Sequence, residues 1–560
     1  MLPRVSNHSI FIDTRKHPQP ITTMKRAGSS EPDAAKADPE RGGSYIAFLG
    51  LIVTLSSITW ALQGGPYAPV MDCDETFNYV EALHYLLHGT GMQTWEYASQ
   101  YGLRSWFYVE LHALPIRFAS LFTSLTKIQE LLLVRLSLHM LSCMLEAFLC
   151  SAISRKFGLN SAWLSAVLLG LSSGMGHARR SFLPSSTCMM AFILAQACWI
   201  RGNFEAALFA GSFSVLVSWP FSAIPYIPIG LHALLKRGIL PVIGVAVASV
   251  VLFGLIPAAV DSMFYGRYAW PTMEMILYNA LGRSGGGAHL YGVESWTYYL
   301  KNLSLNFNVA FPLALLAVVF GDNNLRIYHG LPLLFTALVF QSMAHKEERF
   351  LFMIYPSFCW SAAVFASPKK FGSLWSYWRI GALLIPFIAF SLSRDLALER
   401  LSAPARVFER LNDIPLTGQR TICIGREWHR FPSSFYLPDS LELKWTSSSF
   451  KGILPQPFAA KSNNGYARFV PNMNDLNREE PSRYFPSAKC DFTVDVDEPY
   501  QPDDALQVSK TGWKVIGSCE KFCDLQSSAQ PYRSFAWFLD PWKGVVARNY
   551  CIYSSAGGRI

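Results

Sequence analysis

The sequence predicts a polytopic α-helical membrane protein with a large region outside the membrane at its C-terminal end. Charged residues make up only 16% of the 560 positions and hydrophobic residues 51%, whereas soluble domains carry about 25% charged residues. The apolar residues are clustered into runs, and the mean hydropathy is positive, at +0.21. Lys and Arg gather between alternate pairs of those runs, as is typical of loops on the cytosolic side of a membrane.

Residues 1–43 are predicted to form a disordered cytosolic tail. The tail is rich in proline and mixed charges and poor in aliphatic residues, so it cannot bury enough apolar surface to offset the entropy of ordering. The first apolar run begins at about Ser44, which is too late for a cleavable signal peptide and fits an uncleaved signal anchor. The net charge of +9 is modest and shows no basic stripe interleaved with aromatic residues, so no nucleic-acid partner is expected.

About eleven transmembrane helices are predicted between residues 44 and 392, because a span needs roughly 17–25 largely apolar residues. The apolar segments have the approximate bounds 44–62, 131–153, 162–175, 182–200, 204–219, 221–235, 240–260, 307–320, 327–343, 350–366 and 375–392. With the tail in the cytosol, the five short cytosolic loops contain Arg155 and Lys156, Arg201, Lys236 and Arg237, Arg326, and Lys369 and Lys370. All five obey the positive-inside rule, and an odd number of spans then places the C-terminal region in the lumen.

Three large pieces are expected on the lumenal side: loops at about 63–130 and 261–304, and the C-terminal region 393–560. Short alternating runs in the C-terminal region, separated by Pro, Ser and Asn, predict a small mixed α/β domain. The region holds five of the eleven cysteines, namely Cys423, Cys490, Cys519, Cys523 and Cys551. An oxidising compartment favours one or two disulfides there, whose pairing the sequence does not decide. No cysteine or histidine spacing favours zinc.

The first lumenal loop places Asp72, Asp74 and Glu75 within four residues. One interpretation is that Asp74 caps a helix over 76–88 that ends at Gly89. A cap requires only one acid, however, and three carboxylates beside a membrane repel one another unless a cation engages them. The other interpretation is catalytic, because a carboxylate held at a helix start can act as a general base that takes a proton from a substrate hydroxyl. The two roles are compatible, and both stay open.

Aromatic residues and one strong cation follow in the same loop. Trp95, Tyr97 and Trp106 could stack on sugar rings, or they could belong to an interfacial aromatic belt, which is the commoner role. Arg104 could bind phosphate or pair with Glu96.

A cationic run, His345-Lys-Glu-Glu-Arg-Phe350, joins the ninth and tenth predicted spans on the lumenal side. On a helix, His345, Lys346 and Arg349 would share one face. Such a face can hold a phosphate, with forked hydrogen bonds from Arg and a point charge from Lys. The alternative is a solvated loop, but ionisable groups at membrane boundaries are more often functional. Arg179, followed by Arg180, is a second and weaker lumenal phosphate-binding candidate.

These motifs resemble the dolichyl-phosphate-mannose-dependent mannosyltransferases of the GT-C membrane fold. Within them the chain is most similar to the α-1,2-mannosyltransferases of N-glycan precursor assembly, in glycosyltransferase family 22. The similarity covers roughly residues 44–496. It is carried by stretches 72–115, 182–186, 291–311, 344–356, 425–435, 473–475 and 480–484.

The resemblance implies transfer of mannose in α-1,2 linkage from dolichyl-phosphate-mannose to a dolichyl-pyrophosphate-linked oligosaccharide in the lumen of the endoplasmic reticulum. It implies two additions, the seventh and ninth mannoses, by an inverting reaction that needs neither metal nor cofactor. By position, Asp74 matches the expected base, with Asp72 as the second choice and Glu75 as its neighbour. His345, Lys346 and Arg349 match the run expected to face the donor phosphate, with Arg104 or Arg179 assisting.

Two rival functions are weighed against this hypothesis. A mannosyltransferase of the GPI anchor would share the fold and the first two motifs, but it should lack stretches 425–435 and 480–484. A dolichyl-lipid transporter usually shows paired half-chain repeats and helices broken at the midplane of the bilayer. The sequence shows neither, and its polar residues gather on one predicted side of the membrane.

Overall fold

The structure is a computed structural model that describes residues 39–282, 288–367, 374–459, 470–508 and 512–555. Residues 44–560 form one compact unit. Most of the predicted tail lies outside the described residues, as do Lys369 and Lys370. Helix α1 (Pro39–Leu62) begins a few residues before the expected first span.

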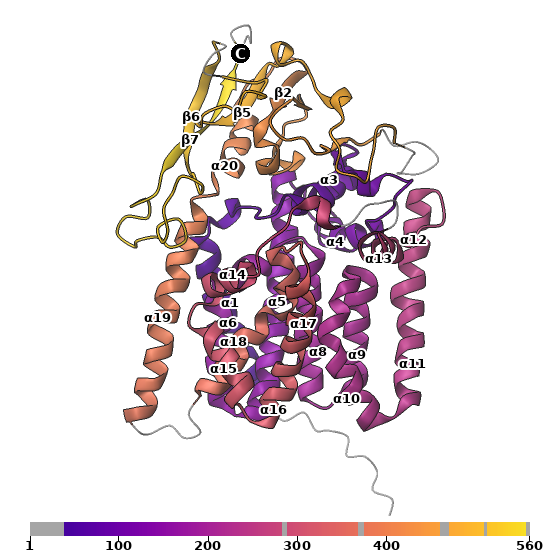
Figure 1. Cartoon of the computed structure of the whole chain (residues 1–560), viewed down its shortest axis with the longest axis vertical. Helices are drawn as coiled ribbons and strands as arrows, with labels where there is room; N and C mark the ends of the chain where they lie inside the picture. Colours follow the sequence, from indigo (N-terminus) through magenta and orange to yellow (C-terminus); the bar gives the residue numbers. More distant parts are fainter. Residues whose placement is uncertain (1–38, 283–287, 368–373, 460–469, 509–511, 556–560) are drawn as a thin grey trace, which may run out of the picture. The chain divides into compact units, whose positions relative to one another are not determined.

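Each of the eleven predicted apolar segments contains helix. The helices concerned are α1, α5 (Lys127–Phe157), α6 (Leu159–Leu171), α8 (Pro184–Ile200), α9 (Phe204–Phe213), α10 (Ile227–Arg237), α11 (Ile239–Ser249) with α12 (Ile256–Tyr265), α15 (Ala310–Phe320), α17 (Leu331–Ser342), α18 (Tyr355–Ala366) and α19 (Leu374–Glu399). They stand side by side as a bundle (Figure 1).

Fewer than eleven of the described helical stretches are long and apolar enough to cross a membrane on their own. Within the described ranges, five helical stretches are long and apolar enough to cross a membrane: Ser44–Leu62, Lys127–Phe157, Ile239–Tyr265, Glu348–Ala366 and Trp378–Glu399. A sixth span results if α14 (Tyr298–Phe307) and α15 count together, although they meet at a bend of 109°. Several other apolar helices are short, so eleven spans stays a prediction.

The three pieces expected on one side of the membrane do meet at one end of the bundle. Helices α3 (Glu81–His88), α4 (Trp106–Ala119) and α13 (Pro271–Leu281) lie there, beneath the C-terminal region (Figure 1). Asp261 accepts hydrogen bonds from the Ser105 hydroxyl and the Phe107 amide. These bonds join the first loop to the second.

The C-terminal region contains a five-stranded mixed sheet, in agreement with the predicted α/β character. The strands are β2 (Arg420–Ile424), β3 (Leu441–Trp445), β5 (Phe492–Val496), β6 (Lys514–Cys523) and β7 (Ala547–Ser554), in the order β3-β2-β5-β7-β6. Strand β2 runs parallel to β3 and β5, whereas β7 is antiparallel to β5 and β6. Two disulfides, Cys423–Cys490 and Cys519–Cys551, stabilise the sheet, and Cys523 is a free thiol.

The C-terminal region contacts the first loop through hydrogen bonds and stacked aromatic rings. The buried carboxylate of Glu81 in α3 accepts hydrogen bonds from the hydroxyls of Ser433 and Ser434 and from the Ser434 amide. Phe77 stacks against Trp428 and Phe431, each with its ring centroid 6.1 Å away. Stretch 425–435, which a GPI-anchor mannosyltransferase is expected to lack, therefore packs directly behind the loop that carries the acidic residues.

Candidate functional site

A cavity of about 470 Å³ lies where the first loop, the second loop, the 343–350 segment and the C-terminal region converge. Its polar lining includes Asp72, Asp74, Asn78, Thr94, Glu96, Arg104, Asn279, Tyr291, His345, Glu347, Arg349 and Asn477. Its apolar lining includes Trp95, Trp219, Phe221, Phe350, Trp428 and Phe450. The cavity thus combines a charged wall with an aromatic one.

Asp72, and not Asp74, caps the helix that follows the first span. The Asp72 carboxylate accepts a hydrogen bond from the Asp74 amide at 2.9 Å and starts α2 (Cys73–Glu75). The chain continues through a π-helical stretch, η2 (Thr76–Val80), into α3, which ends at Gly89 with φ of 78°. The end of this helix was predicted correctly, but its cap was not. Asp74 is consequently free of a capping role, and its side chain remains one third exposed.

Arg349 joins the two aspartates. It lies in the 3₁₀ helix η10 (Glu348–Ile354). Its Nη2 atom is 2.5 Å from Asp74 Oδ2, and its Nε atom is 3.0 Å from Asp72 Oδ2. Glu347 also pairs with the same guanidinium. One cation therefore bridges three carboxylates and offsets part of their mutual repulsion.

The predicted helical face of His345, Lys346 and Arg349 is wrong, because the chain from Met343 to Glu347 is not helical. His345 lines the cavity and pairs through Nε2 with Glu347 Oε1 at 3.1 Å. Lys346 instead is buried, and its ammonium donates to the main-chain carbonyls of Glu294 and Met343. It does not line the cavity, so its predicted contact with the donor phosphate is not supported.

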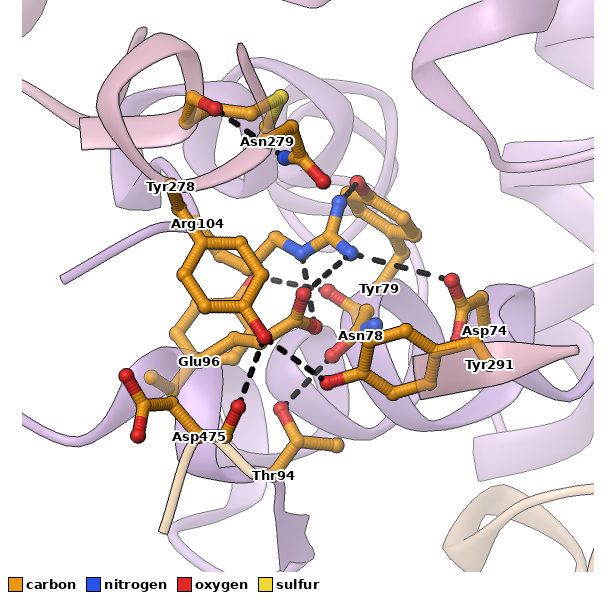
Figure 2. A network of polar contacts seen from close by, with 12 residues as sticks. Asp74, Asn78, Tyr79, Thr94, Glu96, Arg104, Tyr278, Asn279, Tyr291 and Asp475 are labelled. Carbon is orange, nitrogen blue, oxygen red and sulfur yellow. Dashed lines mark hydrogen bonds and ion pairs between the residues drawn. The ribbon is translucent and has the colours of Figure 1, made fainter. Parts of the chain in front are cut away.

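Arg104 provides a second cation on the same wall (Figure 2). It donates from Nε and Nη2 to both oxygens of Glu96, at 3.0 and 2.7 Å, and from Nη1 to the Tyr79 hydroxyl. The Nη2 atom also lies 3.8 Å from Asp74 Oδ2. The predicted pairing with Glu96 is therefore present, and Arg104 also lines the cavity; phosphate binding by Arg104 stays a prediction.

Carboxylates outnumber cations on this wall, and their pKa values reflect it. Burial, together with repulsion from Asp74 and Glu347, raises the pKa of Asp72 to about 7, although Arg349 opposes the rise. Burial likewise raises the pKa of Glu96 against the attraction of Arg104. Burial would also raise the pKa of Glu347, but Arg349 and His345 outweigh it and lower that pKa to about 2. The cluster therefore holds a proton on Asp72 up to near neutral pH.

Two of the predicted charged site residues lie in other networks. Glu75 is buried, accepts from the Phe182 amide, and pairs with Arg135. Arg179 is completely buried and forms two hydrogen bonds of 2.7 Å with Glu146. Neither side chain lines the cavity. The predicted catalytic role of Glu75 and the predicted phosphate contact of Arg179 are therefore not supported by the structure.

Of the predicted sugar-stacking residues, only Trp95 lines the cavity. Its ring lies 5.1 Å from Tyr101 and from Tyr278, edge-on or tilted. Tyr97 and Trp106 are fully buried, pack against each other, and belong to the core. Sequence reasoning could not separate these roles, because all three aromatic residues fall in one short stretch.

A polar network that includes the cavity-lining residues Tyr278 and Tyr291 was missed. Tyr278 donates to the Asp475 carbonyl at 2.8 Å and lies 3.3 Å from the Tyr291 hydroxyl, and Thr94 donates to Asn78 (Figure 2). The available signal was that Tyr291 and Asp475 fall in stretches that carry the resemblance. Tyr278 carried no such signal.

Asp72, Cys73 and Asp74 place potential metal-ligand atoms within 4.8 Å of one another. Both carboxylates of this group already contact Arg349.

Comparisons with known proteins agree with this architecture. Residues 51–438 match the Alg9-like mannosyltransferase family. The chain is 34% identical to human alpha-1,2-mannosyltransferase ALG9, over 83% of this chain and 82% of the human protein. It is 32% identical to the Saccharomyces cerevisiae alpha-1,2-mannosyltransferase ALG9, over 77% and 82%.

A solved structure shows the same fold. ArnT from Cupriavidus metallidurans bound to undecaprenyl phosphate superimposes with a TM-score of 0.54, covering 92% of this chain and 99% of that one. The sequence identity is 12%, so the similarity concerns the fold alone.

Proposed function

The chain belongs to the Alg9-like mannosyltransferase family, and on that premise we propose that it transfers mannose in α-1,2 linkage from dolichyl-phosphate-mannose to a dolichyl-pyrophosphate-linked oligosaccharide. The reaction takes place at the membrane of the endoplasmic reticulum, on its lumenal face, and adds the seventh and ninth mannoses. Relatives named alpha-1,2-mannosyltransferases in animals and yeast support the linkage. Neither a GPI-anchor enzyme nor a lipid transporter is favoured by them.

The observation that carries the mechanism is the contact between Asp74 and Arg349 on one wall of the cavity. Inversion in one displacement requires a base on one side of the anomeric carbon and a stabilised leaving group on the other. Asp74 takes the proton of the acceptor 2-hydroxyl, whose oxygen forms the new bond to the anomeric carbon. The bond from that carbon to the phosphate oxygen breaks, and dolichyl phosphate leaves with the electron pair.

Arg349 and Arg104 hold the departing phosphate. Cations placed in advance around developing negative charge are usually a large contribution to catalysis. An Arg guanidinium offers the forked geometry that phosphate prefers. With two arginines in these positions, the proposed reaction needs no metal ion and no cofactor.

Donor binding also prepares the base. In the structure, Arg349 is shared by Asp72, Asp74 and Glu347. A phosphate that takes over one edge of the guanidinium releases Asp74 from its ion pair. The released carboxylate can then accept a proton from the sugar, so a productive base forms only when the donor is present.

The aromatic side of the cavity suits the lipid part of the donor. Trp219 stacks on Phe350 with ring centroids 5.2 Å apart, and Phe221 adjoins Trp219 at 5.7 Å. Arg349 precedes Phe350 directly in the chain. A phosphate on the arginine would therefore place the first apolar units of a polyprenyl chain near these rings.

The test is a reconstitution with defined substrates. Purified full-length protein would be given dolichyl-phosphate-mannose and a synthetic lipid-linked acceptor carrying six mannoses, followed by linkage analysis of the product. The proposal expects one added mannose in α-1,2 linkage. A product in any other linkage, or transfer to a GPI precursor in place of this acceptor, would refute it.

A further inference from the structure

The connection between β6 and β7, residues 524–546, carries an exposed apolar tip. It leaves the sheet and descends toward the upper end of α19 (Figure 1). Trp537 and Phe538 are 54% and 55% exposed, and Leu539 is fully exposed. Three consecutive large apolar side chains in water are costly, because each fully exposed one forfeits roughly 1.5–3 kcal/mol of burial. Such a patch usually marks an interaction surface.

The position of the tip is fixed, because the residues just before it form hydrogen bonds with α19. The Ala536 amide donates to the Ser393 carbonyl at 3.0 Å, and the Ser393 hydroxyl donates back to the Ala536 carbonyl at 2.7 Å. Arg394 donates to the Ser534 carbonyl at 3.2 Å. These bonds set the height of the tip relative to α19.

The tip therefore lies level with one end of an apolar, membrane-spanning stretch. The stretch Trp378–Glu399 is apolar and long enough to cross a membrane, and its first charged residues near this end are Arg394 and Asp395. Phe535 lies 5.5 Å from Phe390, one helical turn on the apolar side of Arg394. Phe390 is itself 47% exposed, as a lipid-facing residue would be.

We propose that the tip Trp537-Phe538-Leu539 inserts into the interface of the bilayer leaflet that surrounds the adjacent end of α19. Its apolar side chains then continue the exposed face of α19 into the boundary between head groups and acyl chains. The loop thereby gives the C-terminal sheet a second attachment to the membrane, besides the covalent one through α19. This attachment is independent of the proposed reaction.

The composition of the tip fits a lipid interface better than it fits a dry protein partner. Trp is enriched at membrane–water interfaces, where its ring sits at the level of the head groups. The ammonium of Lys543 lies 5.1 Å from the Trp537 ring centroid. A lysine so placed can keep its stem along apolar surface and its charge among lipid phosphates.

Depth-dependent fluorescence quenching tests the proposal on the full chain. Leu539→Cys would carry a small environment-sensitive dye, and the protein would be reconstituted in phosphatidylcholine nanodiscs. A fraction of the lipid would bear a nitroxide on the upper part of its acyl chain. The matched control is Lys514→Cys, an exposed position at the end of β6 remote from the 524–546 connection, and the strand between the two ends is about 30 Å long. Unsubstituted protein treated with the dye corrects for the free cysteines.

The proposal expects quenching by the nitroxide lipid to be several-fold stronger for the dye at 539 than at 514, with a blue-shifted emission only at 539. Equal quenching at both positions would overturn it. A blue shift at 539 without lipid quenching would also overturn it, because a protein surface and not the bilayer would then cover the tip. Both substitutions change exposed side chains, so neither requires the core to repack.

Discussion

The guanidinium of Arg349 lies 2.5 Å from the Asp74 carboxylate, although 275 residues separate them in the chain. This contact unites the acidic and the cationic motifs in one cavity. It also pairs the guanidinium of the cationic motif with carboxylates of the acidic one. The first three predictions below follow from this contact.

Asp74→Asn should abolish mannosyl transfer while dolichyl phosphate still binds. The amide cannot take the hydroxyl proton, and loss of a general base costs about 10²–10⁴-fold in rate. Transfer is measured with a radiolabelled donor, and binding by titration with dolichyl phosphate. Asp439→Asn is the matched control, since its carboxylate is almost fully exposed and pairs only with Lys127 among the described residues. Full activity of the Asp74 variant would remove this residue from the mechanism.

Arg349→Lys should lower kcat/KM strongly even though the charge is retained. Lysine presents a point charge in place of the fork that joins phosphate oxygens, and removing one stabilising donor typically costs about 10²–10³-fold. Arg117→Lys is the control, because Arg117 is half exposed and pairs with Glu110 on α4. Similar kinetics for the two variants would mean that Arg349 is structural.

The donor KM should rise as the pH increases through about 7. The pKa of Asp72 is raised to about 7, so the carboxyl is neutral below that pH and negatively charged above it. The added charge competes with the donor phosphate for Arg349. The measurement is donor KM between pH 6 and 8, in wild type and in Asp72→Asn. The variant should show a flat, low KM, whereas complete inactivity would instead identify Asp72 as the base.

Trp95→Ala should weaken acceptor binding, whereas Trp106→Ala should mainly destabilise the fold. Trp95 lines the cavity but is only 6% exposed, so its loss should raise the acceptor KM about fivefold, equivalent to about 1 kcal/mol, and should lower the melting temperature as well. Trp106 is core, stacked on Phe264 at 5.4 Å, so its loss should destabilise the fold by about 3–5 kcal/mol. Acceptor titration and thermal unfolding in detergent distinguish the two. The reverse pattern would contradict the placement of both residues.

Removing the Cys423–Cys490 bridge should weaken the C-terminal region. The disulfide closes a loop of 67 residues, and losing such a bridge costs about 2–4 kcal/mol. The double serine variant should therefore unfold at lower temperature and be cleaved sooner by protease within residues 393–560. Cys523→Ser, which changes a free thiol, provides the control. Equal protease resistance of both variants would show that the bridge is dispensable.

Much of the fold and part of the site could be predicted from the sequence. The apolar segments, the helix end at Gly89 and the α/β character of the last region are local properties of composition and spacing. The motifs containing Asp74, Arg104 and Arg349 could be found because acids and cations clustered beside a membrane are unusual. Lys346 and Arg179 were predicted from the same kind of clustering, but neither lines the cavity. A charge in the sequence does not reveal whether a buried carbonyl or carboxylate already pairs with it.

The sequence by itself determined that this chain is an apolar helical protein with charged motifs at the ends of its helices, because hydropathy and charge depend only on neighbouring residues. Only the tertiary structure decided that Asp72 is the helix cap, that Asp74 faces the cavity, and that Trp95 lines it while Trp106 fills the core. Those outcomes depend on distances between segments far apart in the chain. Such distances are set by packing of the whole bundle against the C-terminal sheet.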